Sequence, residues 1–255
     1  MSTGGWSAGG EELWILDAET EERSRTAVLT GSGPVWAPDG ERFAVGAGDE
    51  VVIGDALRGT SRSLLKMETS TVVADWSKDG RNLIVMQQEL GSGSPSVVSL
   101  DLEGDNEIRP LVVSPYWELP GRLSPDGRYL AFISDRRDPG SSHFELFVTE
   151  LGGSGGVWQV SADGAPRAFG RGLCDWSVDG KRLYYVNRAG MLMRSDIDTT
   201  NGFRAGAPEQ VSSSIGVVSR VNVAPDGRLL VLRPSEDQAV PPIELVTNWT
   251  ALLER

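Results

Sequence analysis

One short pattern recurs along the chain and constrains its fold more than any other feature. Each copy has a Trp or an aliphatic residue, then a small residue, then a segment that ends in Asp-Gly. The five copies are Val35-Trp36-Ala37-Pro38-Asp39-Gly40, Asp75-Trp76-Ser77-Lys78-Asp79-Gly80, Arg122-Leu123-Ser124-Pro125-Asp126-Gly127, Asp175-Trp176-Ser177-Val178-Asp179-Gly180 and Asn222-Val223-Ala224-Pro225-Asp226-Gly227. Their glycines are 40, 47, 53 and 47 residues apart. A period of this length is typical of a repeated four-stranded unit.

The residue types in each copy predict a β-turn. Pro presets φ at the second position and Gly is favoured at the fourth, while the Asp side chain can bond nearby backbone amides. A strongly apolar segment follows each turn, and runs of this kind are typical of strands buried on both faces. These segments cover residues 43–45, 83–86, 130–133, 183–186 and 229–232. The Trp or aliphatic residue before each turn can pack against a neighbouring unit.

Other segments between the turns predict outer strands with one wetter face. They cover residues 13–17, 145–149 and 191–195, with shorter companions at 25–29 and 157–160. No amphipathic helix of ten or more residues is predicted, apart from a short turn at 249–255. The pattern therefore predicts an all-β chain, a single β-propeller domain over residues 1–255 built of four-stranded antiparallel blades.

The number of blades is open between six and five, and we favour six with the first blade incomplete. Residues 12–30 read as two outer strands of that first blade, and residues 6–10 as a degenerate copy of the turn. The last copy has a third strand at 243–247 and no obvious fourth. Because a closed ring removes exposed sheet edges, strands from the two termini are expected to share a blade.

Composition excludes several classes of function. The net charge is −12 and the pI about 4.6, which argues against nucleic acid and anionic membrane surfaces as partners. The single cysteine, Cys174, is expected to be buried and cannot form an internal disulfide. No apolar run is long enough to span a bilayer, and the N-terminus lacks the features of a signal peptide. The oligomeric state and the compartment stay open. A monomer is favoured, and the sequence is compatible with a cytoplasmic protein or with an extracytoplasmic part of a membrane-spanning parent.

In its recurring turns and the strands that follow them, the chain resembles the TolB-like propeller repeats, which are distant relatives of WD repeats. The resemblance covers nearly the whole chain. The second half also resembles the propeller at the C-terminus of many bacterial Ser/Thr protein kinases. Four stretches carry that second likeness: residues 144–148, 157–161, 202–208 and 248–253. The kinase motifs themselves are absent, so no catalytic residue carries over. TolB binds protein partners through its propeller, and the resemblance therefore implies binding.

Two segments match motifs of other chemistries only in part. Gly152-Gly153-Ser154-Gly155-Gly156 fits the Gly-x-Ser-x-Gly pattern of hydrolases, but a strand follows it and the single histidine, His143, precedes it. We interpret this segment as a hairpin loop. Residues 196–202 resemble a calcium loop with the wrong spacing, and we interpret them as a polar turn. One His and one Cys cannot form a usual zinc site, so no metal or cofactor is predicted.

A binding face is expected on the two segments that interrupt the repeat. Residues 134–142 join the second and third strands of one blade, and residues 114–118 connect that blade to the one before it. Arg and aromatic residues are favoured binding anchors. The candidate residues are Tyr116, Trp117, Arg136, Arg137 and His143. The alternative is that these residues form an ordinary loop surface with one packed Trp.

The sequence thus favours a non-enzymatic propeller that binds a protein or peptide, with no catalytic residue. It is also compatible with the sensor part of a bacterial Ser/Thr kinase. The alternatives are a hydrolase or lyase that uses the propeller channel, an accessory propeller of a Ser peptidase, and a structural module that positions another domain. The recurring turn aspartates (Asp39, Asp79, Asp126, Asp179 and Asp226) are interpreted as structural, since one copy per blade serves no catalytic mechanism.

Overall fold

The computed structural model describes residues 11–16, 23–30, 34–88, 95–152, 155–166 and 173–233. The chain divides into two compact units, Met1–Val113 and Ser114–Arg255, and each is described by itself. The prediction of a single domain over the whole chain stays a prediction. The described residues are almost entirely strands and turns, with one short 3-10 helix (Ser213–Ile215) and no α-helix among them.

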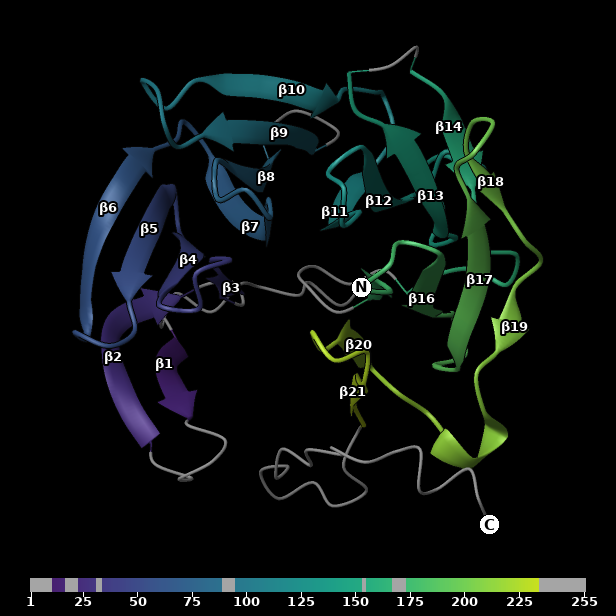
Figure 1. The fold of residues 1–255 in the computed structure, drawn as a ribbon. Coiled ribbons are helices and arrows are strands. Elements are labelled where there is room, and N and C mark those ends of the chain that lie inside the picture. The colour runs from purple at the N-terminus through teal and green to yellow at the C-terminus, as the bar shows by residue number, and fades with distance from the viewer. Residues whose placement is uncertain are drawn as a thin grey trace. The chain divides into compact units, whose positions relative to one another are not determined.

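The first unit contains three antiparallel sheets whose strands follow one another in chain order (Figure 1). The first sheet pairs β1 with β2, the second has the order β3-β4-β5-β6, and the third has the order β7-β8-β9-β10. The strands are β1 (Glu11–Leu16), β2 (Arg23–Thr30), β3 (Val35–Trp36), β4 (Arg42–Ala47), β5 (Glu50–Asp55), β6 (Thr60–Lys66), β7 (Ser70–Trp76), β8 (Asn82–Gln88), β9 (Ser96–Asp101) and β10 (Ile108–Val112).

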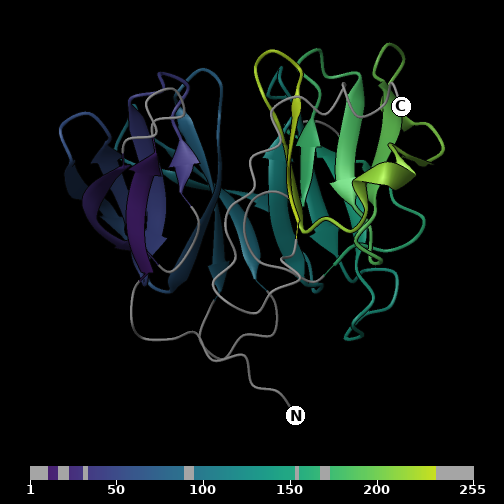
Figure 2. The ribbon, with the colours of Figure 1, turned by 90° about the horizontal axis from the view of Figure 1, so that it is seen from below.

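The second unit repeats this plan, and Figure 2 shows the strands of its sheets running up and down beside one another. One sheet has the order β11-β12-β13-β14, the next has β15-β16-β17-β18 with β19 also paired to β17, and β20 pairs with β21. The strands are β11 (Glu118–Leu123), β12 (Tyr129–Ser134), β13 (Glu145–Glu150), β14 (Val157–Gln159), β15 (Cys174–Trp176), β16 (Arg182–Val186), β17 (Leu192–Asp198), β18 (Arg204–Ala205), β19 (Glu209–Gln210), β20 (Arg220–Val223) and β21 (Leu229–Leu232).

The five predicted turns are all present and join the first two strands of a sheet in each case. In every copy the glycine N–H donates to the carbonyl of the small residue three positions earlier, at 2.8 to 3.0 Å. Each glycine has a φ between 71° and 85°, which L side chains rarely adopt. In every copy the Asp carboxylate also accepts the N–H of the residue two positions later. The structural interpretation of the turn aspartates is therefore confirmed.

The turn exists in two versions that depend on the small residue. Where that residue is Ser, as in Ser77, its hydroxyl donates to Asp79 at 2.6 Å and accepts the N–H of Asn82 at 2.8 Å. Where that residue is Ala, an arginine after the turn donates the side-chain hydrogen bond to the turn aspartate instead. Arg42 then donates from Nε to Asp39 at 2.7 Å.

Acid should weaken the turns that contain Asp79 and Asp179. The Ser77 hydroxyl and the Arg81 N–H lower the pKa of Asp79, and Ser177 and the Lys181 N–H do the same for Asp179. A lowered carboxyl pKa contributes stability above the unfolded pKa of about 3.9, and this contribution is lost as the pH falls through the folded pKa. We expect the free energy of unfolding, measured by urea denaturation, to decrease between about pH 5 and about pH 2. The decrease should be smaller in the double variant Asp79→Asn/Asp179→Asn, and an identical pH dependence would contradict this account.

The second strand of each sheet is buried as predicted in most copies. The third strand departs from the prediction at 145–149, whereas half-buried and exposed positions alternate with buried ones along most of β17, which includes most of the predicted segment 191–195. All six residues of β12 are buried. The expectation of a wetter face for residues 145–149 is wrong, because β13 is buried at its four central positions. Strands β5 and β9 show the same pattern, so the solvated edge of these sheets is the fourth strand. In β21, burial alternates and Leu230 is 37% exposed.

The aromatic residue before the turn packs between sheets in two copies. Trp76 joins Val35, Ala44 and Ile53 in one buried core cluster, so β7 packs against the preceding sheet of the first unit. Trp176 donates from Nε1 to the carbonyl of Arg122 in β11 at 3.1 Å. Trp36 differs, because it is 45% exposed and contacts Phe43 of its own sheet edge-on.

These observations establish an all-β fold of repeated antiparallel sheets, each opened by the same turn. Six blades rather than five stays a prediction. The residues that would decide it, at 6–10 and 243–247, lie outside the described part of the chain, as do residues 248–255.

Candidate functional site

Two loops of the second unit carry the candidate site. Residues 114–117 lead into β11, and residues 135–144 join β12 to β13, the second and third strands of the sheet, as predicted. The loops meet at Asp135, which is 2% exposed. Its Oδ1 accepts the N–H of Trp117 at 2.9 Å, and its Oδ2 accepts the N–H of Gly140 at 3.0 Å. One buried carboxylate thus fixes both loops.

A buried ion pair lies beside this junction. Glu118, the first residue of β11, is 0% exposed. Its Oε1 accepts the Arg136 Nη2–H at 2.7 Å and the Ser114 hydroxyl at 2.6 Å. Its Oε2 is also buried and has no hydrogen-bond partner among the residues that the structure describes. Burial of a carboxylate is costly unless it is paired, so Arg136 and Glu118 depend on each other.

Three aromatic rings surround the Arg136 guanidinium. Its central carbon lies 5.1 Å from the ring centroids of Phe132 and Phe147, and 5.7 Å from that of Tyr116. Phe132 and Phe147 are register partners on β12 and β13, and their rings stack at 5.9 Å. Cation–π contacts of this kind orient a guanidinium on an apolar platform. The Arg136 side chain is 18% exposed, so this oriented group still reaches the surface.

The five candidate residues fall into two groups. Tyr116, Trp117 and Arg136 lie together at the loop junction, and we call Ser114, Tyr116, Trp117, Glu118 and Arg136 the arginine cluster. Arg137 and His143 lie farther along the 135–144 loop and are exposed. His143 Nδ1 lies 3.3 Å from Asp138 Oδ2, with both side chains more than half exposed.

Sequence reasoning missed Glu118, Asp135 and the two phenylalanines of this site. A signal for the two acids was present, because each adjoins an apolar strand segment that leaves few places for a solvated carboxylate. Phe132 and Phe147 looked like ordinary core residues, and only the register between β12 and β13 places them below Arg136.

No cluster of metal ligands is found in the described residues. They contain no group of three or more His, Cys, Asp and Glu side chains that could hold a metal ion. At the calcium-like segment, Asp198 instead accepts the N–H and the hydroxyl of Thr200, as expected for a polar turn. Ser154 lies outside the described residues, and the segment after it forms β14 as predicted. No helix within the described ranges is long and apolar enough to cross a membrane.

Fold and site together define a β-propeller that carries an arginine–aromatic cluster on two of its loops. Solved structures agree with this class, and TolB proteins are among them. TolB from Agrobacterium tumefaciens is 16% identical, with a TM-score of 0.67 over 92% of this chain and 82% of that one. TolB from Acinetobacter baumannii is 19% identical, with a TM-score of 0.58 over 77% of this chain. The Swd1 β-propeller domain of Myceliophteria thermophila is 10% identical, with a TM-score of 0.59 over 87% of this chain and 73% of that one.

These likenesses show the fold alone at such low identities. The chain spans 48% of the length of the Acinetobacter TolB. No protein-family model matches the sequence, and no curated protein matches it either.

Proposed function

We propose that the chain is a non-enzymatic propeller that binds a protein or peptide through the arginine cluster and the neighbouring 135–144 loop. The observation that carries this proposal is the fixed position of Arg136, held by buried Glu118 and three aromatic rings. Arginine and aromatic side chains whose conformations are already set lose little entropy on binding, which favours them as anchors. Likeness to TolB and Swd1 propellers is consistent with a binding role.

The test uses a peptide selected from a displayed library against the intact chain. We expect the affinity of the selected peptide, measured by calorimetry, to fall about tenfold or more in Tyr116→Ala, as is typical when a binding anchor is truncated. Arg137→Ala should weaken binding less, because Arg137 is exposed and lies outside the cluster. Arg136→Ala is a poor probe of binding, because it also breaks a buried ion pair.

Arg128→Ala is the matched control. Arg128 is an exposed arginine of the same blade, at the opposite end of β12, where it pairs with Glu150. Its replacement should leave the affinity unchanged. Equal affinity of the wild type and Tyr116→Ala would refute the proposed face. Turnover in esterase, glycosidase or lactonase screens, absent from a preparation of a control protein, would refute the non-enzymatic part of the proposal.

We further propose that the chain is the sensing part of a bacterial Ser/Thr kinase. The support is the resemblance of residues 144–148, 157–161, 202–208 and 248–253 to the propellers of such kinases. The coding sequence upstream of Met1 tests this. A kinase domain and a transmembrane segment there would support the proposal, whereas a signal peptide would favour a periplasmic, TolB-like role and overturn it.

A further inference from the structure

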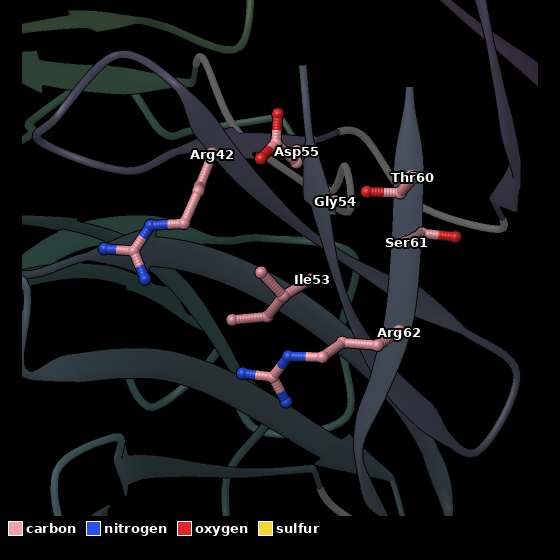
Figure 3. Close-up of a pocket in the computed structure, with 7 residues that line it drawn as sticks. All are labelled: Arg42, Ile53, Gly54, Asp55, Thr60, Ser61 and Arg62. Carbon is pink, nitrogen blue, oxygen red and sulfur yellow. The ribbon is translucent and has the colours of Figure 1, made fainter. Parts of the chain in front are cut away.

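A cavity of about 230 Å³ opens on the sheet β3-β4-β5-β6 of the first unit (Figure 3). It is lined by residues of β4, β5 and β6 and does not involve the arginine cluster. Pockets for whole drug-sized ligands usually measure about 300–1,000 Å³. The cavity therefore suits one end group of a larger ligand.

Strand register explains which side chains face the cavity. Arg42 pairs with Asp55, and Asp55 pairs with Thr60, which forms one row across the three strands. Ile53 pairs with Arg62 in a second row, two residues away along β5. Because side chains alternate between the faces of a strand, both rows lie on one face of the sheet. Figure 3 shows the two guanidinium groups extending to the same side, with Ile53 between them.

One of the two arginines is held in place. Arg42 Nε donates to Asp39 Oδ2 at 2.7 Å, and its guanidinium carbon lies 5.6 Å from the Trp76 ring centroid. These contacts leave its two terminal nitrogens with no hydrogen-bond acceptor within the described ranges. Arg62 is exposed and has neither an ion pair nor a hydrogen bond to any described side chain. The cavity thus presents donors from two guanidinium groups.

Asp55, the carboxylate that lines the cavity, already forms hydrogen bonds within its own loop. Asp55 Oδ1 accepts the N–H groups of Leu57 and Arg58 at 3.0 and 2.8 Å, and its Oδ2 binds Arg58 Nη1 at 2.7 Å. These bonds lower the pKa of Asp55, with the Arg58 N–H as the largest favourable contribution. Arg58 offsets the charge of Asp55, and Asp39 offsets that of Arg42. Arg62 therefore carries the uncompensated positive charge of the cavity, while the terminal nitrogens of Arg42 remain available as donors.

We propose that this cavity binds an oxyanion, a phosphoryl or carboxylate end group of a larger ligand, between Arg42 and Arg62. The guanidinium fork matches the oxygen spacing of both groups. The Thr60 hydroxyl, which points toward the Asp55 side of the cavity in Figure 3, is a further donor. The Ile53 side chain gives the apolar part of the ligand a surface to contact. This site goes beyond the proposed partner face and does not depend on it.

The test is an NMR titration of the 15N-labelled full chain at constant ionic strength, with inorganic phosphate in one arm and acetate in the other. We expect saturable shifts of the amides of Gly54, Ser61 and Arg62, with millimolar affinity for at least one anion. The arm with the higher affinity identifies the end group. Arg62→Gln should weaken binding about tenfold, as expected for loss of a charge-assisted hydrogen bond.

Arg109→Gln is the matched control. Arg109 lies on β10, the fourth strand of the next sheet, as Arg62 lies on β6, but it pairs with Glu107 at 2.7 Å. This variant should bind the anion like the wild type. Equal weakening in both variants would indicate general electrostatic attraction and overturn the proposal. Shifts that do not saturate in either arm would overturn it as well. Neither result would affect the proposed peptide face, which involves other residues.

Discussion

Replacing Arg136 by methionine is expected to lower the free energy of unfolding by about 3–5 kcal/mol. The cost arises because Glu118, which is 0% exposed, would lose its charged partner while remaining buried. Methionine keeps much of the apolar contact with Phe132 and Phe147, so the loss reports on charge rather than on packing. Urea denaturation of the full chain, followed by tryptophan fluorescence, measures it.

A double variant separates the two contributions. Glu118→Leu/Arg136→Met removes both charges, and replacement of a buried pair by apolar residues is often neutral or stabilising. We expect it to regain most of the stability lost in Arg136→Met. Arg137→Met, at the exposed neighbouring position, should change the free energy of unfolding by less than about 0.5 kcal/mol. A cost below about 1 kcal/mol for Arg136→Met would show that Glu118 is not held as a buried ion pair.

The stability of these variants decides which of them can report on binding. A variant that loses binding because it is less folded says nothing about the binding face. The double variant keeps the fold but removes the guanidinium, so it isolates the role of Arg136 in recognition. If it is as stable as the wild type and still binds the selected peptide with full affinity, Arg136 is structural and the anchor must be Tyr116 or Trp117.

Much of the fold could be predicted because its signals are local. The turn at residues 37–40 uses the intrinsic preferences of Pro, Asp and Gly, and these act within a few residues. The same holds for the apolar strand that follows each turn. The repeat then supplies the architecture, because each copy forms the same hairpin. The polar turn after Asp198 was predicted correctly for the same reason.

The parts that could not be predicted depend on contacts distant in the sequence. Residues 145–149 alternate in polarity only weakly, and their burial follows from the strands on either side of β13. The pairing of Glu118 with Arg136 needs the loop after β12 to return to the start of β11. The loop containing Tyr116 and the loop containing Arg136 were expected to share a face, and the structure brings them together. The apolar strand before Asp135 indicates that this acid is buried, but the sequence does not indicate which N–H groups of the two loops it accepts.

Asp175 shows that contacts distant in the sequence also determine the role of residues within the repeat. Asp75 and Asp175 precede the Trp in two copies of the repeat, and the sequence alone predicts no role for either. Both are buried, and each accepts the N–H of the Trp that follows it at 2.9 Å. Asp175 also bonds Arg122 of β11 at 3.0 Å and the Val223 N–H of β20 at 2.8 Å. One carboxylate therefore ties together the first strands of three sheets in the second unit.

Replacing Asp175 by alanine is accordingly expected to lower the free energy of unfolding by about 3–5 kcal/mol. The side chain is 7% exposed and that of Arg122 is 18% exposed, so the variant loses a largely desolvated ion pair. It also removes the acceptor of the backbone N–H of Val223, a half-buried residue, and the loss of this hydrogen bond is part of the same total. Urea denaturation measures the loss, and hydrogen exchange at the Val223 amide should accelerate in the variant.

Asp179→Ala is the control for this prediction, since Asp179 belongs to the same hairpin but lies in the exposed turn, where it bonds Ser177 and the Lys181 N–H. Its loss should cost clearly less than that of Asp175, because water can replace the bonds of an exposed carboxylate. Equal costs for the two variants, or unchanged exchange at Val223, would mean that Asp175 does not join the sheets. A larger cost for Asp175→Ala, together with faster exchange at Val223, would identify it as the residue through which one repeat stabilises the next.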